Sequence, residues 1–131
     1  MEMLNILGIT SIYAACLGLV FMLLSFNVIR FRWKFRVGLG GGHKPLDRAV
    51  RIHGNFSEYT ALILLLLALY EVSGADTRLV HTAGASLLIG RCLHAIGLTM
   101  SSGTSVPRFS GMILTFLSLG LTSIGLLMNT F

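Results

Sequence analysis

Acidic residues are scarce in this sequence, and charged residues of either sign are few. Asp and Glu number five against ten Lys and Arg, and only 11% of the 131 residues are charged. Hydrophobic residues make up 54% of the chain, which is typical of an integral membrane protein rather than of a soluble domain. The net charge of +5 would suit nucleic acid, but the basic residues cluster beside apolar segments. We therefore expect membrane lipid and no nucleic acid as a partner.

Cysteine is also rare, since the chain has only Cys16 and Cys92. Both lie inside apolar runs, which excludes a disulfide framework and favours small buried side chains. No two histidines have the i, i+4 spacing with a carboxylate that a helical zinc site uses. The four histidines are His43, His53, His81 and His94. We therefore expect no metal, and we expect these side chains to form hydrogen bonds.

Long apolar runs predict four membrane-spanning helices, and hence an all-α integral membrane four-helix bundle with a single domain over residues 1–131. We expect the helices at residues 4–34, 45–72, 77–100 and 106–128. The first run follows no basic residue and is too long for a signal peptide, so we interpret it as an uncleaved helix. Pro45 is expected to open the second helix, and Ser105 to cap the fourth, with Pro107 just inside.

The second predicted helix carries polar residues at membrane depth. Its apolar run covers only about ten residues, and a spanning helix needs roughly twenty, so the polar stretch before it must enter the membrane. At about 100° per residue, Arg51, Asn55 and Glu58 fall on one narrow face, with Arg48 and Tyr59 at its edge. Such groups normally face a bundle interior or a wet cavity and indicate a functional site. The alternative is a buried salt-bridge network that only holds helices together.

Small residues recur along the first and fourth predicted helices. In lipid, helices associate by packing, and small residues let backbones approach closely. A first seam follows steps of three and four residues, and we expect it to pack within the chain or between subunits. It comprises Gly8, Ser11, Ala15, Gly18, Met22 and Ser25. Its continuation reaches Arg32, which should face the bundle. A second seam recurs every seven residues and comprises Gly111, Ser118 and Gly125.

The basic residues are distributed unevenly between the two ends of the predicted bundle. Of the ten Lys and Arg, seven lie between Arg30 and Arg51, and Arg91 and Arg108 flank the loop between the third and fourth helices. Only Arg78 lies at the end that carries the termini. The positive-inside rule then predicts that both of these loops lie in the cytoplasm and the termini outside. We expect a multi-pass integral membrane protein of the bacterial inner membrane.

The motif Arg48-x-x-Arg51-x-x-x-Asn55-x-x-Glu58-Tyr59 resembles the signature of the MAPEG family, the membrane-associated proteins in eicosanoid and glutathione metabolism. The resemblance covers essentially the whole chain. It implies a four-helix membrane bundle that assembles as a homotrimer and binds glutathione between neighbouring subunits, near the cytoplasmic side. Arg51, Asn55, Glu58 and Tyr59, with Arg48 at the edge, would then bind glutathione.

Other segments support this resemblance. Arg91-x-x-His94 resembles the third helix of the prostaglandin-synthase branch, and Val106-Pro107-Arg108 lies where the family carries an arginine at the start of its fourth helix. The resemblance implies that Arg32, Arg91 and His94 contribute around the glutathione site. There are also departures, because Leu98 replaces a tyrosine of several members and Trp33 replaces a second arginine of leukotriene synthase. The departures leave the second substrate open.

The resemblance implies a glutathione-dependent transferase, with peroxidase activity as a further possibility, that conjugates lipophilic electrophiles at the membrane. A thiol with a pKa near 8.5 is mostly protonated at neutral pH, so its activation requires a fixed positive charge. Arg108, in the first turn of the fourth helix, is the candidate catalytic residue. The main alternative is a non-catalytic membrane protein of this fold that binds a lipid or a partner. A third reading is a small transporter with a proton-coupled Glu58, although four helices without a repeat offer little for alternating access.

Overall fold

Each of the four apolar runs forms one long helix in the computed structural model, which describes residues 6–131. The helices are α2 (Gly8–Phe35), α3 (Lys44–Val72), α4 (Thr77–Met100) and α5 (Val106–Thr130). All four are long and apolar enough to cross a membrane. The predicted bounds of the last three helices are confirmed to within two residues. The predicted start of the first helix, at residue 4, lies outside the described residues.

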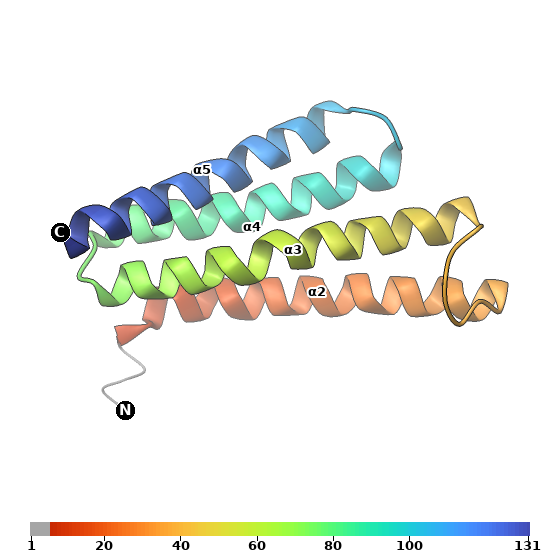
Figure 1. Ribbon diagram of the computed structural model, residues 1–131, viewed down its shortest axis with the longest axis horizontal. Helices are drawn as coiled ribbons and strands as arrows, with labels where there is room; N and C mark the ends of the chain where they lie inside the picture. Colours follow the sequence, from red (N-terminus) through yellow and green to blue (C-terminus); the bar gives the residue numbers. More distant parts are fainter. Residues whose placement is uncertain (1–5) are drawn as a thin grey trace.

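The helices run up and down beside one another, with α3 and α4 in the middle of the bundle (Figure 1). Helices α3 and α4 pack against each other, and each of them contacts α2 and α5. The start of α2 and the end of α5 lie at one end of the bundle, and the loops over residues 36–43 and 101–105 lie at the opposite end (Figure 1). The helix ends that carry most of the basic residues therefore share one end of the molecule.

The helix ends follow local sequence signals. Pro45 lies in the first turn of α3, where its missing N–H is not needed. Ser105 caps α5 by accepting a hydrogen bond from the Arg108 N–H at 3.4 Å, as predicted. The start of α2 is different because its N-cap residue forms no side-chain cap. The carboxylate of Glu71, on α3, instead accepts hydrogen bonds from the backbone N–H groups of Ile9 and Thr10 at 2.9 and 2.8 Å.

The second predicted seam packs within the chain. A Cβ added at Gly111 would lie 2.6 Å from the backbone carbonyl oxygen of Gly90, so α4 and α5 touch through their backbones there. Ser118 is fully buried and donates a hydrogen bond to the Ala83 carbonyl at 2.8 Å. A Cβ at Gly125 would meet the ring of Tyr70 at 2.6 Å. The prediction for this seam is confirmed.

Most of the first predicted seam does not pack within the chain, which leaves packing between subunits as the alternative. A Cβ added at Gly8 or Gly18 would meet nothing within 4 Å, and Met22 is 46% exposed. The side of α2 that packs on the bundle is instead the one that carries Leu17, which is 1% exposed. At about 100° per residue, most of the seam lies on the other side of α2. Small residues indicate that a close approach is possible but not which chain makes it, so packing between subunits stays a prediction.

Candidate functional site

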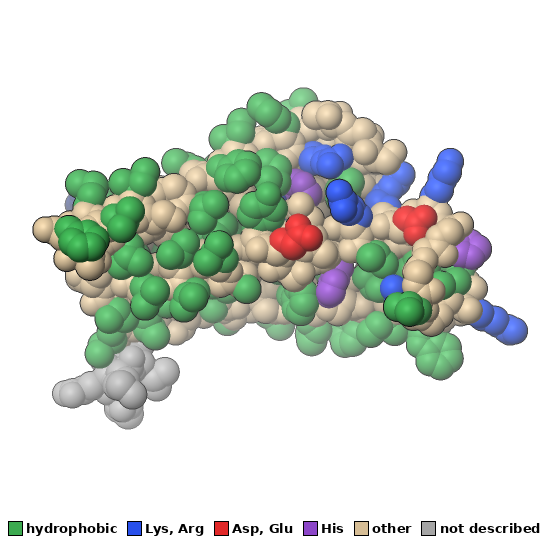
Figure 2. Space-filling model, in the orientation of Figure 1, with side chains coloured by type: hydrophobic (Ala, Val, Ile, Leu, Met, Phe, Trp, Pro, Cys, Tyr) green, Lys and Arg blue, Asp and Glu red, His purple; other side chains and the backbone are tan. Residues whose placement is uncertain are grey.

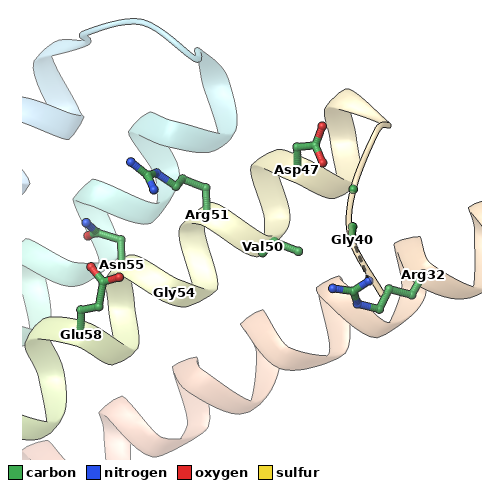
Figure 3. A pocket seen from close by; sticks show the side chains of 9 residues that line it. Arg32, Gly40, Asp47, Val50, Arg51, Gly54, Asn55 and Glu58 are labelled. Atoms are coloured by element: carbon green, nitrogen blue, oxygen red, sulfur yellow. Dashed lines mark hydrogen bonds between the residues drawn. The ribbon is translucent and has the colours of Figure 1, made fainter. Parts of the chain in front are cut away.

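The polar face of α3 forms one wall of an open pocket near the loop end of the bundle. Arg51, Asn55 and Glu58 lie at spacings of four and three residues, so their side chains project from one face over two turns (Figure 3). Arg32 reaches the same pocket from α2 (Figure 3). The pocket has a volume of about 530 Å³, which lies within the range of small-molecule sites. Its other lining residues are Gly40, Gly41, Asp47, Val50 and Gly54.

The loop over residues 36–43 closes one end of this pocket. Arg32 Nη1 donates hydrogen bonds to the carbonyl oxygens of Val37 and Gly40, at 3.4 and 3.2 Å. Asp47 Oδ1 accepts a hydrogen bond from the Gly42 N–H at 3.1 Å. Gly40 and Gly42 both have positive φ, at 82° and 98°, which a residue with a Cβ adopts only with strain. The glycines therefore let the loop turn back toward the first turn of α3 and the end of α2.

Two charged side chains of the pocket, Arg51 and Glu58, have no hydrogen-bond partner among residues 6–131. Arg51 and Glu58 are exposed and Asn55 is half-buried. Among residues 6–131 the side-chain hydrogen bonds of the pocket involve Arg32, Asp47 and Asn55, and the side chains of Arg51 and Glu58 form none. A charged face on a membrane-spanning helix is costly unless it meets water, a ligand or another chain. The exposed charges therefore indicate a surface that binds something.

Arg91 lies directly behind the pocket and is buried, with 1% of its surface exposed. Its Nη1 donates to Asn55 Oδ1 at 2.7 Å and to the Asn55 backbone carbonyl at 3.2 Å. Its Nε donates to Thr115 Oγ1 at 3.1 Å, and its Nη2 contacts Met112 Sδ at 3.3 Å. The guanidinium carbon lies 5.2 Å from the centre of the Tyr59 ring. Arg91 thus joins α3, α4 and α5, and it fixes the orientation of the Asn55 amide.

The remaining predicted site residues lie outside this pocket in a single chain. His94 is buried, at 3% exposure. Arg48 donates to the Thr99 carbonyl at 3.1 Å and borders a separate small cleft. Tyr59 packs edge-to-face on Phe116 at 5.9 Å. The structure therefore brings Arg32, Arg51, Asn55 and Glu58 together. It leaves the other predicted residues, Arg48, Tyr59, Arg91, His94 and Arg108, beside or behind them.

Arg108 lies at the same end of the bundle, on the first turn of α5. Its Nη1 donates to the carbonyl oxygens of Ser102 and Gly103, both at 3.2 Å. Its backbone packs so closely on Gly97 that a Cβ there would lie 2.5 Å from the Arg108 nitrogen. The guanidinium therefore borders the loop over residues 101–105 and not the pocket of its own chain.

Two of the four histidines form side-chain hydrogen bonds, as predicted. The prediction is wrong for His43 and His94, whose side chains form none among residues 6–131, because His43 stacks on Phe35 and His94 is buried between helices. His53 Nε2 lies 3.1 Å from Ser25 Oγ, and His81 Nδ1 lies 3.0 Å from the Tyr13 hydroxyl. Among residues 6–131, no group of three His, Cys, Asp or Glu side chains could hold a metal ion.

Sequence reasoning missed Thr115 and Met112 as partners of Arg91. One signal in the sequence was available. Thr115 lies four residues after Gly111 of the packing seam, so it is on the side of α5 that faces the other helices and could reach Arg91.

Together, the fold and the pocket define a multi-pass membrane protein with an ionic binding pocket near one end of its helices. The model of the MAPEG family matches residues 10–128, so the chain belongs to this family. The chain is also 41% identical over 90 residues to the inner membrane protein YecN of Escherichia coli K12 and to its counterpart in strain O6:H1. This match covers 68% of the chain and 69% of the relative. The predicted family and membrane localisation are confirmed.

Proposed function

We propose that this protein is a glutathione-dependent transferase that conjugates lipophilic electrophiles at the membrane, and that its site also supports peroxidase chemistry. The pocket carries the proposal, because it gathers Arg32, Arg51, Asn55 and Glu58 in one chain of a family associated with glutathione. In this proposal the chain forms a homotrimer. Each site then lies between neighbouring subunits, which would cover the exposed charges.

The donor set of the pocket fits glutathione. That molecule has two carboxylates, one ammonium, two amides and a thiol. Arginine pairs with carboxylates in a forked geometry, so Arg32 and Arg51 suit its carboxylates. Glu58 suits the ammonium group, and the amide of Asn55 suits a peptide group. Because Asn55 Oδ1 already accepts a hydrogen bond from Arg91, its NH₂ group is the part that remains available as a donor. Tyr59, Arg48 and His94 would then act from the edge of the site.

The proposed catalytic residue is Arg108 of a neighbouring subunit. Glutathione supplies the nucleophilic sulfur, and a fixed cation favours the thiolate form. Arg108 lies at the N-terminus of α5, where the helix dipole adds positive potential. In its own chain the guanidinium contacts the loop over residues 101–105 and not the pocket. A homotrimer gives each pocket access to Arg108 from another copy.

Glutathione binding by the purified protein in detergent, measured by titration calorimetry, tests this proposal. Arg51→Ala and Glu58→Gln should each weaken binding by about 2 kcal/mol, or about thirty-fold, because a charged hydrogen bond is lost. Arg78→Ala is the matched control, since Arg78 is an exposed arginine near the opposite end of the bundle. Unchanged affinity in both pocket variants would refute the site.

A second candidate function is binding without turnover, as in a non-catalytic lipid- or partner-binding protein of this fold. The observation that favours it is the contact of Arg108 with the Ser102 and Gly103 carbonyls, which leaves the pocket of one chain without that cation. Thiol consumption with a chloro-nitroaromatic electrophile distinguishes the two. Glutathione binding together with no consumption above the uncatalysed rate would support the second candidate.

A further inference from the structure

The last turns of α2 carry a groove that lies outside the apolar part of the helix. Residues 8–29 rise about 33 Å, which matches the roughly 30 Å thickness of a hydrocarbon core. The turns from Arg30 to Phe35 therefore project into the headgroup layer. The groove there has a volume of about 720 Å³ and is lined by Ile29, Arg32, Trp33, Arg36, Val37 and Gly38. Only Arg32 is shared with the pocket of the proposed glutathione site.

The lining side chains form a graded stripe along α2. Ile29, Arg32, Trp33 and Arg36 lie at i, i+3, i+4 and i+7, which places them on one side of the helix. Ile29 is 48% exposed at the apolar end, and Trp33 is 80% exposed one turn further on. An indole at this depth is typical of the membrane interface, and arginine beyond it reaches the phosphates. Along the stripe the side chains change from apolar to aromatic to basic. The parts of a phospholipid follow a matching order, from acyl chain through glycerol to headgroup.

Arg36 has a backbone conformation that an arginine rarely adopts. It ends α2 in the left-handed region, at φ 54° and ψ 43°. The Val37 N–H donates to the Arg32 carbonyl at 3.0 Å, and the Arg36 N–H to the Trp33 carbonyl at 3.3 Å. This is the arrangement in which glycine usually occurs, because glycine adopts it without strain. The sequence places a cation at a strained position where glycine would stabilise the turn, and such outliers often have a functional reason.

The charged side chains that line the groove are all basic. No acidic side chain lines it, and Arg30 and Lys34 lie on the same turns of α2. Basic side chains gather at the loop end of the face shown in Figure 2. We propose that this groove binds the phosphate headgroup of an anionic membrane phospholipid. The guanidinium group of Arg36 binds the phosphate, and Trp33 and Ile29 pack against the glycerol and the first part of an acyl chain.

Trp33 is the single tryptophan of the chain, so its fluorescence reports directly on this groove. The full-length protein is reconstituted in phosphatidylcholine vesicles that contain a tenth phosphatidylglycerol, and bromine is placed on the acyl chains of one lipid at a time. Brominated phosphatidylglycerol should quench Trp33 about five-fold more, per mole, than brominated phosphatidylcholine, as expected for one added cation–headgroup contact. Arg36→Gly should remove this preference while keeping the fold, because it relieves the strain at the end of α2.

Lys34→Gln is the matched control, because it removes one positive charge from the same turn without touching the groove. It should keep most of the preference, and Arg36→Gln should lose it. Equal losses in the two variants would overturn the site in favour of diffuse surface charge. Equal quenching by both lipids, or no quenching by either because a neighbouring subunit covers Trp33, would also overturn it. The proposal would also be overturned if glycerol phosphate, added to the protein in detergent, changed the Trp33 fluorescence as much as phosphatidylglycerol does. The ligand would then be a soluble phosphate.

Discussion

Arg51 and Arg91 lie close to the same asparagine but in opposite environments. Arg91 is 1% exposed, and its guanidinium donates to Asn55, Thr115 and Met112. Arg51 is exposed and lines the pocket, and its side chain forms no hydrogen bond among the described residues. The donors of Arg91 are thus occupied by its own chain, whereas those of Arg51 are available to a ligand. The comparison separates an arginine that holds helices together from one that recognises a partner.

Asn55 connects the two environments. Its side-chain oxygen accepts the Arg91 hydrogen bond at 2.7 Å, and its side chain lies in the wall of the pocket (Figure 3). A change at Arg91 should therefore act on binding through Asn55 as well as on stability. A change at Arg51 should act on binding alone. Variants at Arg91 and Arg51 test this distinction directly, and variants at Arg108 and Gly18 test catalysis and assembly.

Arg91→Ala should destabilise the fold by about 3–5 kcal/mol, because it leaves Asn55 and Thr115 with unpaired polar groups and opens a cavity between three helices. Thermal unfolding in detergent measures this change. Arg78→Ala is a control on the same helix. Because Arg78 is exposed, this variant should change the free energy of unfolding by no more than about 0.5 kcal/mol. Equal stability of the two variants would show that the buried contacts of Arg91 make no net contribution to the free energy of unfolding.

Arg108→Ala should cut turnover by about ten-fold to a thousand-fold while glutathione stays bound, because the cation that favours the thiolate is lost. The measurement is thiolate absorbance in the ultraviolet against pH, together with conjugation of a chloro-nitroaromatic electrophile. The bound thiol should titrate at a higher pKa in the variant. If it titrates as in the parent and turnover is intact, Arg32 or His94 must be tested instead.

Arg51→Ala should weaken glutathione binding by about 2 kcal/mol and change the free energy of unfolding by no more than about 0.5 kcal/mol, since Arg51 has no bond to lose inside the chain. Calorimetric titration and thermal unfolding of the same preparation measure both quantities. A large loss of stability would show that Arg51, like Arg91, holds helices together and is not free to bind a ligand.

Gly18→Leu should have the smallest effect on the single chain, because a Cβ at Gly18 meets nothing within 4 Å. If α2 packs on a neighbouring subunit, the variant should weaken the oligomer by about 1 kcal/mol, since the close approach is blocked. Analytical ultracentrifugation in detergent measures the shift in association. Gly120→Leu on α5 is a matched control, because that glycine also has open space around it. A Gly18→Leu variant that associates like the parent would show that this face contacts lipid.

The sequence predicted the parts of the structure that depend on local signals. Pro45 and Ser105 marked helix starts because a missing N–H and a side-chain cap act within one turn. The spacing of Arg51, Asn55 and Glu58 predicted their common face because helix periodicity is fixed by the backbone. The Glu71 cap on α2 was not predicted, since it joins residues that are more than 60 positions apart in the chain.

The sequence by itself therefore determined the four spans, the bounds of α3, α4 and α5, and the polar face of α3, because length, hydrophobicity and periodicity act along a single helix. Only the tertiary structure decided which side of α2 packs and which arginines are buried. The small residues of α2 and the glycines of α5 follow similar patterns, yet only the α5 seam meets a backbone in its own chain. The reason is that burial depends on the rotation of each helix toward its neighbours, and that rotation is set by the contacts of all four helices at once.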